Sequence, residues 1–212
     1  MAMPTFVNQT GQESNLSTNL GKIAWPAAIL VAISGLLYSI SYIFIKDNLW
    51  NGLFLMTSGL LGGLVMVSLY ELIKAVDSGL ALVALILAIF GAGGATVHGG
   101  YDLALGINPV QTLPGGVADL PSQIDPRGLL TFGIAGLAVF IFTWLMKQSG
   151  HFPALIIYCG WILAILMEVL YLGRLIILDA KNPVIVVTAL LAGFILNPAW
   201  YVLLGLQFKD KQ

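Results

Sequence analysis

The chain has 212 residues, of which 58% are hydrophobic and 9% are charged, and its formal net charge is −1. Soluble domains carry about a quarter charged residues, so most of this chain is expected to lie in lipid. The balanced charge leaves no basic surface for nucleic acid, and the single cysteine, Cys159, excludes an intramolecular disulfide and a thiolate metal site.

Residues 1–23 are rich in Asn, Gln, Ser and Thr, which predicts a polar N-terminal tail rather than a cleaved signal peptide. Residues 24–206 contain apolar stretches that each reach the roughly 20 residues a helix needs to cross a bilayer. These stretches are Ala24–Ile45, Leu49–Ile73, Gly79–Leu105, Gly128–Met146, Pro153–Leu178 and Pro183–Leu206. Because lipid cannot satisfy open backbone groups, the sequence predicts an all-α polytopic membrane protein, a six-transmembrane-helix bundle with a short tail at 207–212.

Local signals support several of these helices. Asp125-Pro126 opens the fourth span and Asn182-Pro183 the sixth, and a cap residue before proline is typical of a helix start. Trp25-Pro26 is expected at the start of the first span, where aromatic rings favour the membrane interface. Small residues recur at helix-packing intervals and predict close helix contacts. These pairs are Gly59 with Gly63, Gly91 with Ala95, and Ala189 with Gly193.

The connection from Gly106 to Arg127 is long and rich in proline and glycine. A long non-helical connection in a compact domain is usually either a functional cover or disordered. Two interpretations stay open: a lid over one end of the third span, or a passive loop that packs across the lipid headgroups.

Charged residues inside spans are rare and are candidates for function. Glu71 lies one turn before Lys74 and is expected to pair with it locally. Arg174 is near enough to the end of the fifth span to extend toward the headgroups or to meet Asp179 in the following turn. Glu168 lies too deep for this, so we expect it to have a polar partner, with Tyr171 or a group on the third span as the leading candidates.

His98 and Asp102 are four residues apart and therefore share one face of the third span. A carboxylate one turn from a histidine can orient one ring nitrogen, so a hydrogen-bonded pair at the mouth of a covered cavity is expected. The same spacing supplies two metal ligands, but a metal needs a third and a fourth. His151 starts the fifth span at the opposite membrane face, so neither a metal site nor a bis-histidine haem is predicted.

The predicted topology brings the remaining candidates into one half of the bundle, because the third and fifth spans end where the fourth and sixth begin. The candidate ligand-binding residues are His98, Tyr101, Asp102, Arg127, Glu168, Tyr171 and Arg174. In the sixth span, Asn197-Pro198 interrupts the helix, either as a simple kink or as a broken span that lines a site.

The orientation follows from the basic residues that flank the spans. The side that holds both termini carries Lys22, Lys74, Lys147, Lys209 and Lys211, and the other side carries Lys46, Arg127, Arg174 and Lys181. This small excess predicts cytoplasmic termini.

Four segments together resemble a group of uncharacterised prokaryotic integral membrane proteins with six predicted spans. They are HGGYDLA (98–104), SQIDPRG (122–128), YLGRL (171–175) and NPAWY (197–201). The resemblance covers the third to sixth spans and implies a bacterial cell membrane, but it implies no activity or cofactor.

Three classes of function remain open. The first is binding, with or without transport, of a small molecule or proton in a polar cavity that Glu168, His98 and Asp102 line. The second is a structural or accessory subunit that packs against other membrane subunits, with lipids as its other partners. The third is a membrane-embedded enzyme in which His98 is a general base oriented by Asp102 and an arginine holds an anionic headgroup.

Overall fold

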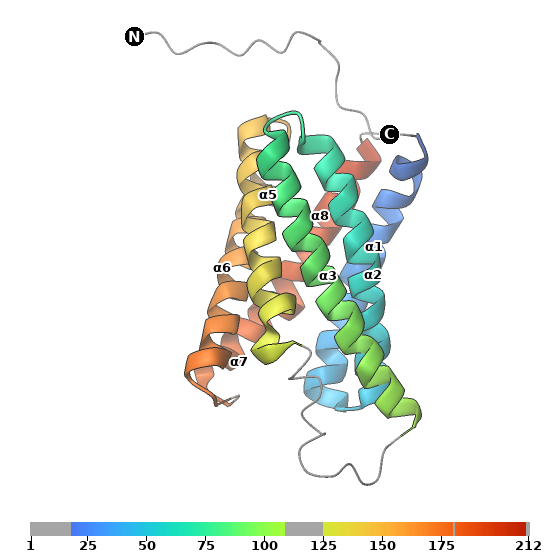
Figure 1. The fold of residues 1–212 in the computed structure, drawn as a ribbon, viewed down its shortest axis with the longest axis vertical. Coiled ribbons are helices and arrows are strands. Elements are labelled where there is room, and N and C mark those ends of the chain that lie inside the picture. Colours follow the sequence, from blue (N-terminus) through green and yellow to red (C-terminus); the bar gives the residue numbers. More distant parts are fainter. Residues whose placement is uncertain (1–17, 109–124, 180, 211–212) are drawn as a thin grey trace.

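The computed structural model describes residues 18–108, 125–179 and 181–210, and every regular element in these ranges is a helix (Figure 1). Six helical stretches are long and apolar enough to cross a membrane. They are Asn19–Ile45, Asn48–Ile73, Ser78–Ile107, Leu129–Ser149, Ala154–Ile176 and Pro183–Asp210. The prediction of an all-α, six-helix membrane bundle is confirmed.

The first span consists of α1 (Thr18–Ile40) and η1 (Ser41–Ile45), and α2 (Asn48–Ile73) and α3 (Ser78–Ile107) follow it. The fourth span contains a short turn, η3 (Pro126–Gly128), then η4 (Leu129–Ile134) and α5 (Ala135–Ser149), and α6 (Ala154–Ile176) is the fifth. The last span comprises α7 (Pro183–Leu190), η5 (Leu191–Leu196) and α8 (Asn197–Asp210).

The start of α1 and the end of α8 lie at the same end of the bundle (Figure 1). We call this end the terminal side, and we call the opposite end, where the first span turns into the second, the distal side. Helix α1 begins before the predicted Ala24, so part of the segment predicted as a polar tail (1–23) is helical. Pro26 therefore lies inside α1 rather than at its start.

Two of the predicted helix starts have their caps. The Asn182 side chain accepts a hydrogen bond from the backbone N–H of Val184 at 3.0 Å, and Pro183 occupies the first helical turn. Asp125 accepts from Leu130 N–H at 2.7 Å. Both contacts satisfy backbone donors that have no partner within the helix, so these two predictions are confirmed.

Glycines bring α2 and α3 together along most of their length. A Cβ atom added to Gly52 would lie 2.6 Å from the Gly99 carbonyl oxygen, and one added to Gly59 would lie 2.7 Å from the Thr96 nitrogen. Such backbone-to-backbone contact is the usual way in which helices associate in lipid. The predicted packing role is confirmed for Gly59 and also for Gly91, where an added Cβ would lie 2.7 Å from the Ala135 Cβ.

The bundle is solid on the terminal side. Its largest fully buried side chains come from the middle and terminal-side parts of α2, α5 and α8 and from the middle of α1 and α6. They include Leu69, Ile73, Phe142, Leu145, Met146, Trp200, Leu204 and Phe208. The distal half has no comparable set among the described residues, so the two halves of the bundle differ in how they are filled.

Three spans contain a π-helical segment, namely η1, η4 and η5. Such wide turns are rare and occur often at functional sites. For η5 the sequence supplies a cause: Pro198 has no N–H for the carbonyl of Phe194, so the normal helical hydrogen bond cannot form there. The predicted interruption of the sixth span thus takes the form of a π-helical segment that ends directly before Asn197.

Candidate functional site

A cavity of about 750 Å³ lies in the distal half, and residues from all six spans line it. This volume is within the range of small-molecule pockets. Along α3 the lining runs from Ala88 to His98, which corresponds to roughly 15 Å along the helix axis. The cavity therefore extends from the distal membrane surface to about the middle of the bilayer, where the solid terminal half closes it.

The cavity exists because small residues stand where large side chains fill the other half. Glycine and alanine contribute a large share of the lining, including Gly35, Gly59, Gly62, Gly91, Ala92, Ala95, Ala135, Ala138, Ala189 and Gly193. The three π-helical segments also border it, through Tyr42, Thr131 and Gly193 among others. The irregular backbone thus lies around the hollow half of the bundle.

Arg174 is the cationic group at the distal end of the cavity. Its guanidinium carbon lies 5.5 Å from the centre of the Phe132 ring, and a Cβ on Gly128 would be 3.1 Å from its Nη1. Among the described residues no carboxylate lies within ion-pair distance of Arg174. Its side chain therefore brings to the cavity a positive charge that no described carboxylate neutralises in a direct ion pair.

Asp125 also lines the cavity, but both of its carboxylate oxygens already accept hydrogen bonds from the protein. The residue is 2% exposed, and its two oxygens accept hydrogen bonds from Leu130 N–H at 2.7 Å, Thr131 N–H at 3.2 Å and the Thr131 hydroxyl at 2.5 Å. The start of a helix favours a negative charge. Asp125 is thus a structural cap that fixes η4 beside the cavity.

Replacing Asp125 with alanine is expected to lower the free energy of unfolding by about 2 kcal/mol, because three donors at the start of η4 lose their acceptor. Asp125→Asn keeps one acceptor oxygen and should lose less. Thermal unfolding in detergent compares the two variants. Equal stability of Asp125→Ala and the wild type would contradict the capping role.

His98 and Asp102 lie close together, at 3.7 Å between Nε2 and Oδ2. This distance allows an ion pair when His98 is protonated, but it is too long for the direct hydrogen bond that the spacing suggested. His98 lines the cavity, whereas Asp102 is not part of its lining. Residues 109–124 of the predicted lid lie outside the described residues.

Glu168 and Tyr171 lie between the fourth and fifth spans rather than in the cavity. A Cβ on Gly136 would be 2.8 Å from Glu168 Oε1, and one on Gly133 would be 2.9 Å from the Tyr171 ring. Glu168 Oε1 is buried and has no hydrogen-bond partner among the described residues, and the carboxylate borders the backbone of Leu137. The expected hydrogen bond from Tyr171 or from the third span is therefore absent there.

The other candidate residues lie away from the cavity lining. Tyr101 is partly buried on α3, and Arg127 is exposed, with a left-handed backbone (φ 57°) that is uncommon for a residue other than glycine. Glu71 forms the predicted local pair, with Lys74 Nζ donating to its Oε2 at 2.6 Å. This hydrogen bond raises the pKa of Lys74.

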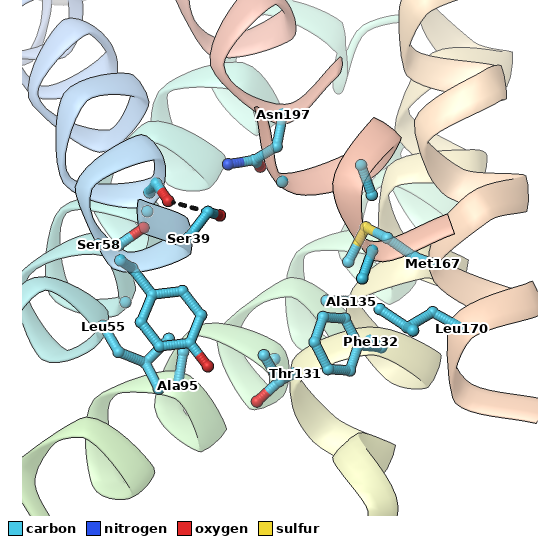
Figure 2. A pocket seen from close by; sticks show the side chains of 18 of the residues that line it. Ser39, Leu55, Ser58, Ala95, Thr131, Phe132, Ala135, Met167, Leu170 and Asn197 are labelled. Atoms are coloured by element: carbon cyan, nitrogen blue, oxygen red, sulfur yellow. Dashed lines mark hydrogen bonds between the residues drawn. The ribbon is translucent and has the colours of Figure 1, made fainter. Parts of the chain in front are cut away.

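Neutral polar groups that the charge pattern could not reveal gather at the inner end of the cavity. Figure 2 shows Asn197 extending toward the cavity from the last span, with Ser39 and Ser58 nearby on the first two spans. The Ser39 hydroxyl donates to the Gly35 carbonyl at 3.1 Å. The side chains of Asn197, Ser58 and Tyr201 have no hydrogen-bond partner in the described part of the chain.

Exposed residues in the cavity lining indicate a sideways opening between η1 and α7. Tyr42 and Phe44 on η1 line the cavity and yet are 56% and 70% exposed. Val186 and Leu190 on α7 likewise line it and are exposed. Phe194 meets Phe44 edge-on at 6.1 Å, which bridges the two spans beside this opening. In a bilayer the opening would face the lipid of the distal leaflet.

Compared with known protein families, with curated proteins and with solved structures, the chain has no significant match. The fold and the site therefore define its class by themselves. It is an integral membrane protein, a six-helix bundle with one solid half and one hollow half.

Proposed function

We propose that this protein binds a small molecule in the distal cavity. The observation that carries the proposal is the set of unpartnered polar groups that line the cavity, since Arg174, Asn197, Ser58 and Tyr201 have no hydrogen-bond or ion-pair partner among the described residues. Unpaired polar groups within a membrane are costly, so water or a ligand is needed to satisfy them.

The surroundings of the cavity support binding more than pure scaffolding. A subunit that served only for packing would have no need of a cavity of about 750 Å³ bordered by three π-helical segments. Transport across the membrane would additionally require the solid terminal half to open.

The proposal places the protein in a bacterial cell membrane with cytoplasmic termini, among lipids and other membrane subunits.

Protein purified in a mild detergent is expected to carry about one small-molecule mass per chain in native mass spectrometry. Ala95 lines the cavity (Figure 2), so Ala95→Phe should fill part of it and reduce the bound fraction by at least about tenfold. Ala104 lies on the same helix but faces outward, so Ala104→Phe is the matched control.

Ala189→Phe fills the cavity from α7 and repeats the test with an independent variant. Thermal unfolding verifies that each variant is folded. A wild-type protein without any bound mass, or equal binding by the cavity-filling and control variants, would overturn the proposal.

A further inference from the structure

We infer that the ligand is an elongated amphipathic anion, which reaches the cavity sideways from the lipid, places its charged end at Arg174 and places a neutral polar group near Asn197. This inference rests on the proposed function and specifies the chemistry of the ligand. It follows from the order in which charged, apolar and neutral polar side chains line the cavity.

The sign of the charge follows from the groups at the distal end. The Asp125 carboxylate accepts hydrogen bonds from the first backbone N–H groups of η4, and the Asp102 carboxylate lies beside His98. Arg174 keeps its charge without a carboxylate partner among the described residues. A guanidinium binds carboxylates and phosphates through paired hydrogen bonds, so an anionic group is the natural partner for it.

The tyrosines of η1 and α1 extend this polar end. The Tyr38 and Tyr42 rings lie 5.8 Å apart, and both residues line the cavity. Arg174, Asp102 and Asp125 are close enough to Tyr38 to act on it electrostatically. A phenolic hydroxyl can donate to an anion, so Arg174 and the tyrosines provide donors of the kind a headgroup needs.

The section next to Arg174 is apolar. Leu163, Met167 and Leu170 line the cavity from α6, at the spacing of one helix face. The run from Leu163 to Arg174 measures roughly 16 Å along the helix axis. On the neighbouring helix α7, which packs against α6, Ile185 and Ala189 add further apolar side chains to the cavity lining. A hydrocarbon chain would be buried here in the same orientation as a lipid of the distal leaflet.

The inner end is polar but uncharged. Asn197 stands fourteen residues after Pro183, which places it roughly 20 Å into the last span, near the middle of the bilayer. Its amide offers donors and an acceptor, and the Ser58 and Tyr201 hydroxyls line the same end. A plain hydrocarbon end would leave these groups unpaired, so the ligand carries a hydrogen-bonding group at this distance from its charge.

The sideways opening between η1 and α7 fits this ligand. Tyr42, Phe44, Val186 and Leu190 form an apolar and aromatic rim that faces the surrounding lipid. An amphiphile in the distal leaflet would already have its charge near the level of Arg174 and its chain at the level of the rim. It could enter without passing its charge through the hydrocarbon, which is the costly step for a charged group.

The test uses saturable binding of radiolabelled ω-hydroxydodecanoate to the full-length protein in phosphatidylcholine nanodiscs, with empty nanodiscs subtracted. Extended, this chain is about as long as the apolar section of the cavity from Leu163 to Arg174, roughly 16 Å along the helix axis. Dodecanoate lacks the ω-hydroxyl that is expected near Asn197, and dodecanediol lacks the charge. Each should compete about tenfold more weakly. Inorganic phosphate should not compete, because it lacks the chain.

The variants separate the contacts. Arg174→Gln should weaken binding of both acids about tenfold and leave dodecanediol unchanged, and Arg174→Lys should retain part of the affinity. Asn197→Ala should reduce ω-hydroxydodecanoate to the level of dodecanoate. Ala95→Phe should abolish binding of every probe, whereas Ala104→Phe should not alter it.

Failure of the inference can be told from failure of the proposed function. If dodecanediol binds as tightly as the acids, or if Arg174→Gln binds them normally while Ala95→Phe still abolishes binding, the cavity binds a ligand but not an anion. If inorganic phosphate alone displaces the radiolabelled probe, the ligand is a small free anion, and the inference of an amphipathic ligand is wrong. Absence of saturable binding by all probes would refute the ligand class. The proposed function is tested independently, by the small-molecule mass that native mass spectrometry detects on the purified protein.

Discussion

Gly99→Ala is expected to lower the free energy of unfolding by about 3 kcal/mol, because overpacking a tight helix contact costs this much and the obstacle here is backbone. A Cβ on Gly99 would collide with the Met56 nitrogen and would lie 2.8 Å from the Gly52 carbonyl oxygen. Backbone atoms cannot turn aside as a side chain can. The two helices must therefore separate, which also loosens the wall of the cavity that both of them form.

Gly93→Ala in the same helix is the matched control. No atom lies within 4 Å of the position that its Cβ would occupy, so nothing has to move. Alanine also favours a helix over glycine by up to about 1 kcal/mol, and this variant should be as stable as the wild type or more so. Thermal unfolding in the same detergent measures both variants. Similar unfolding temperatures for Gly99→Ala and Gly93→Ala would rule out the tight α2–α3 contact.

The fold was largely predictable because membrane helices need little more than length and apolarity. Six apolar runs gave six spans, and Asn182-Pro183 located the start of the last one to the residue. Boundaries set by polar helical turns were harder to predict. Thr18 to Ile23 are helical although the segment is not uniformly apolar, since a helix outside the hydrocarbon has no requirement for apolar residues.

The candidate site was less predictable, because charge marks a residue but not the direction in which its helix faces. His98 and Asp102 are about 40° apart around α3, which is enough for one to line the cavity and the other not to. Glu168 belongs to the α5–α6 contact instead. The direction of each face depends on how the helices pack, and the sequence pattern alone did not specify that packing.

Apart from Asn197, which the Asn197-Pro198 interruption marked, the neutral part of the site gave no signal that could be distinguished from ordinary helix residues. Serine and tyrosine are common in membrane spans, where they bond to their own backbone or lie at the interface. Ser39 does bond to its own helix, at Gly35, and yet it also lines the cavity. Only the convergence of all six spans on one volume distinguishes Ser58 and Tyr201 from such residues.

Ser58→Cys is expected to react with a charged, water-soluble methanethiosulfonate reagent at least about 100-fold faster than Leu60→Cys, because the thiolate that reacts requires water. The two residues are two positions apart on α2, within roughly 3 Å of the same depth. Ser58 lines the cavity, whereas Leu60 is 60% exposed on the outer face and would contact lipid. Depth is thus matched and only the surroundings differ. Both variants carry Cys159→Ala, which leaves one thiol.

The same pair also reports on occupancy. Adding ω-hydroxydodecanoate should slow the labelling of Ser58→Cys, and introducing Ala95→Phe should slow it without any ligand, because each removes water from the same volume. Leu60→Cys should respond to neither. The decisive comparison is therefore the rate at Ser58→Cys against the rate at Leu60→Cys in sealed vesicles. If both thiols react slowly and at the same rate, the distal half of the bundle contains no water, and its polar groups must be satisfied in another way.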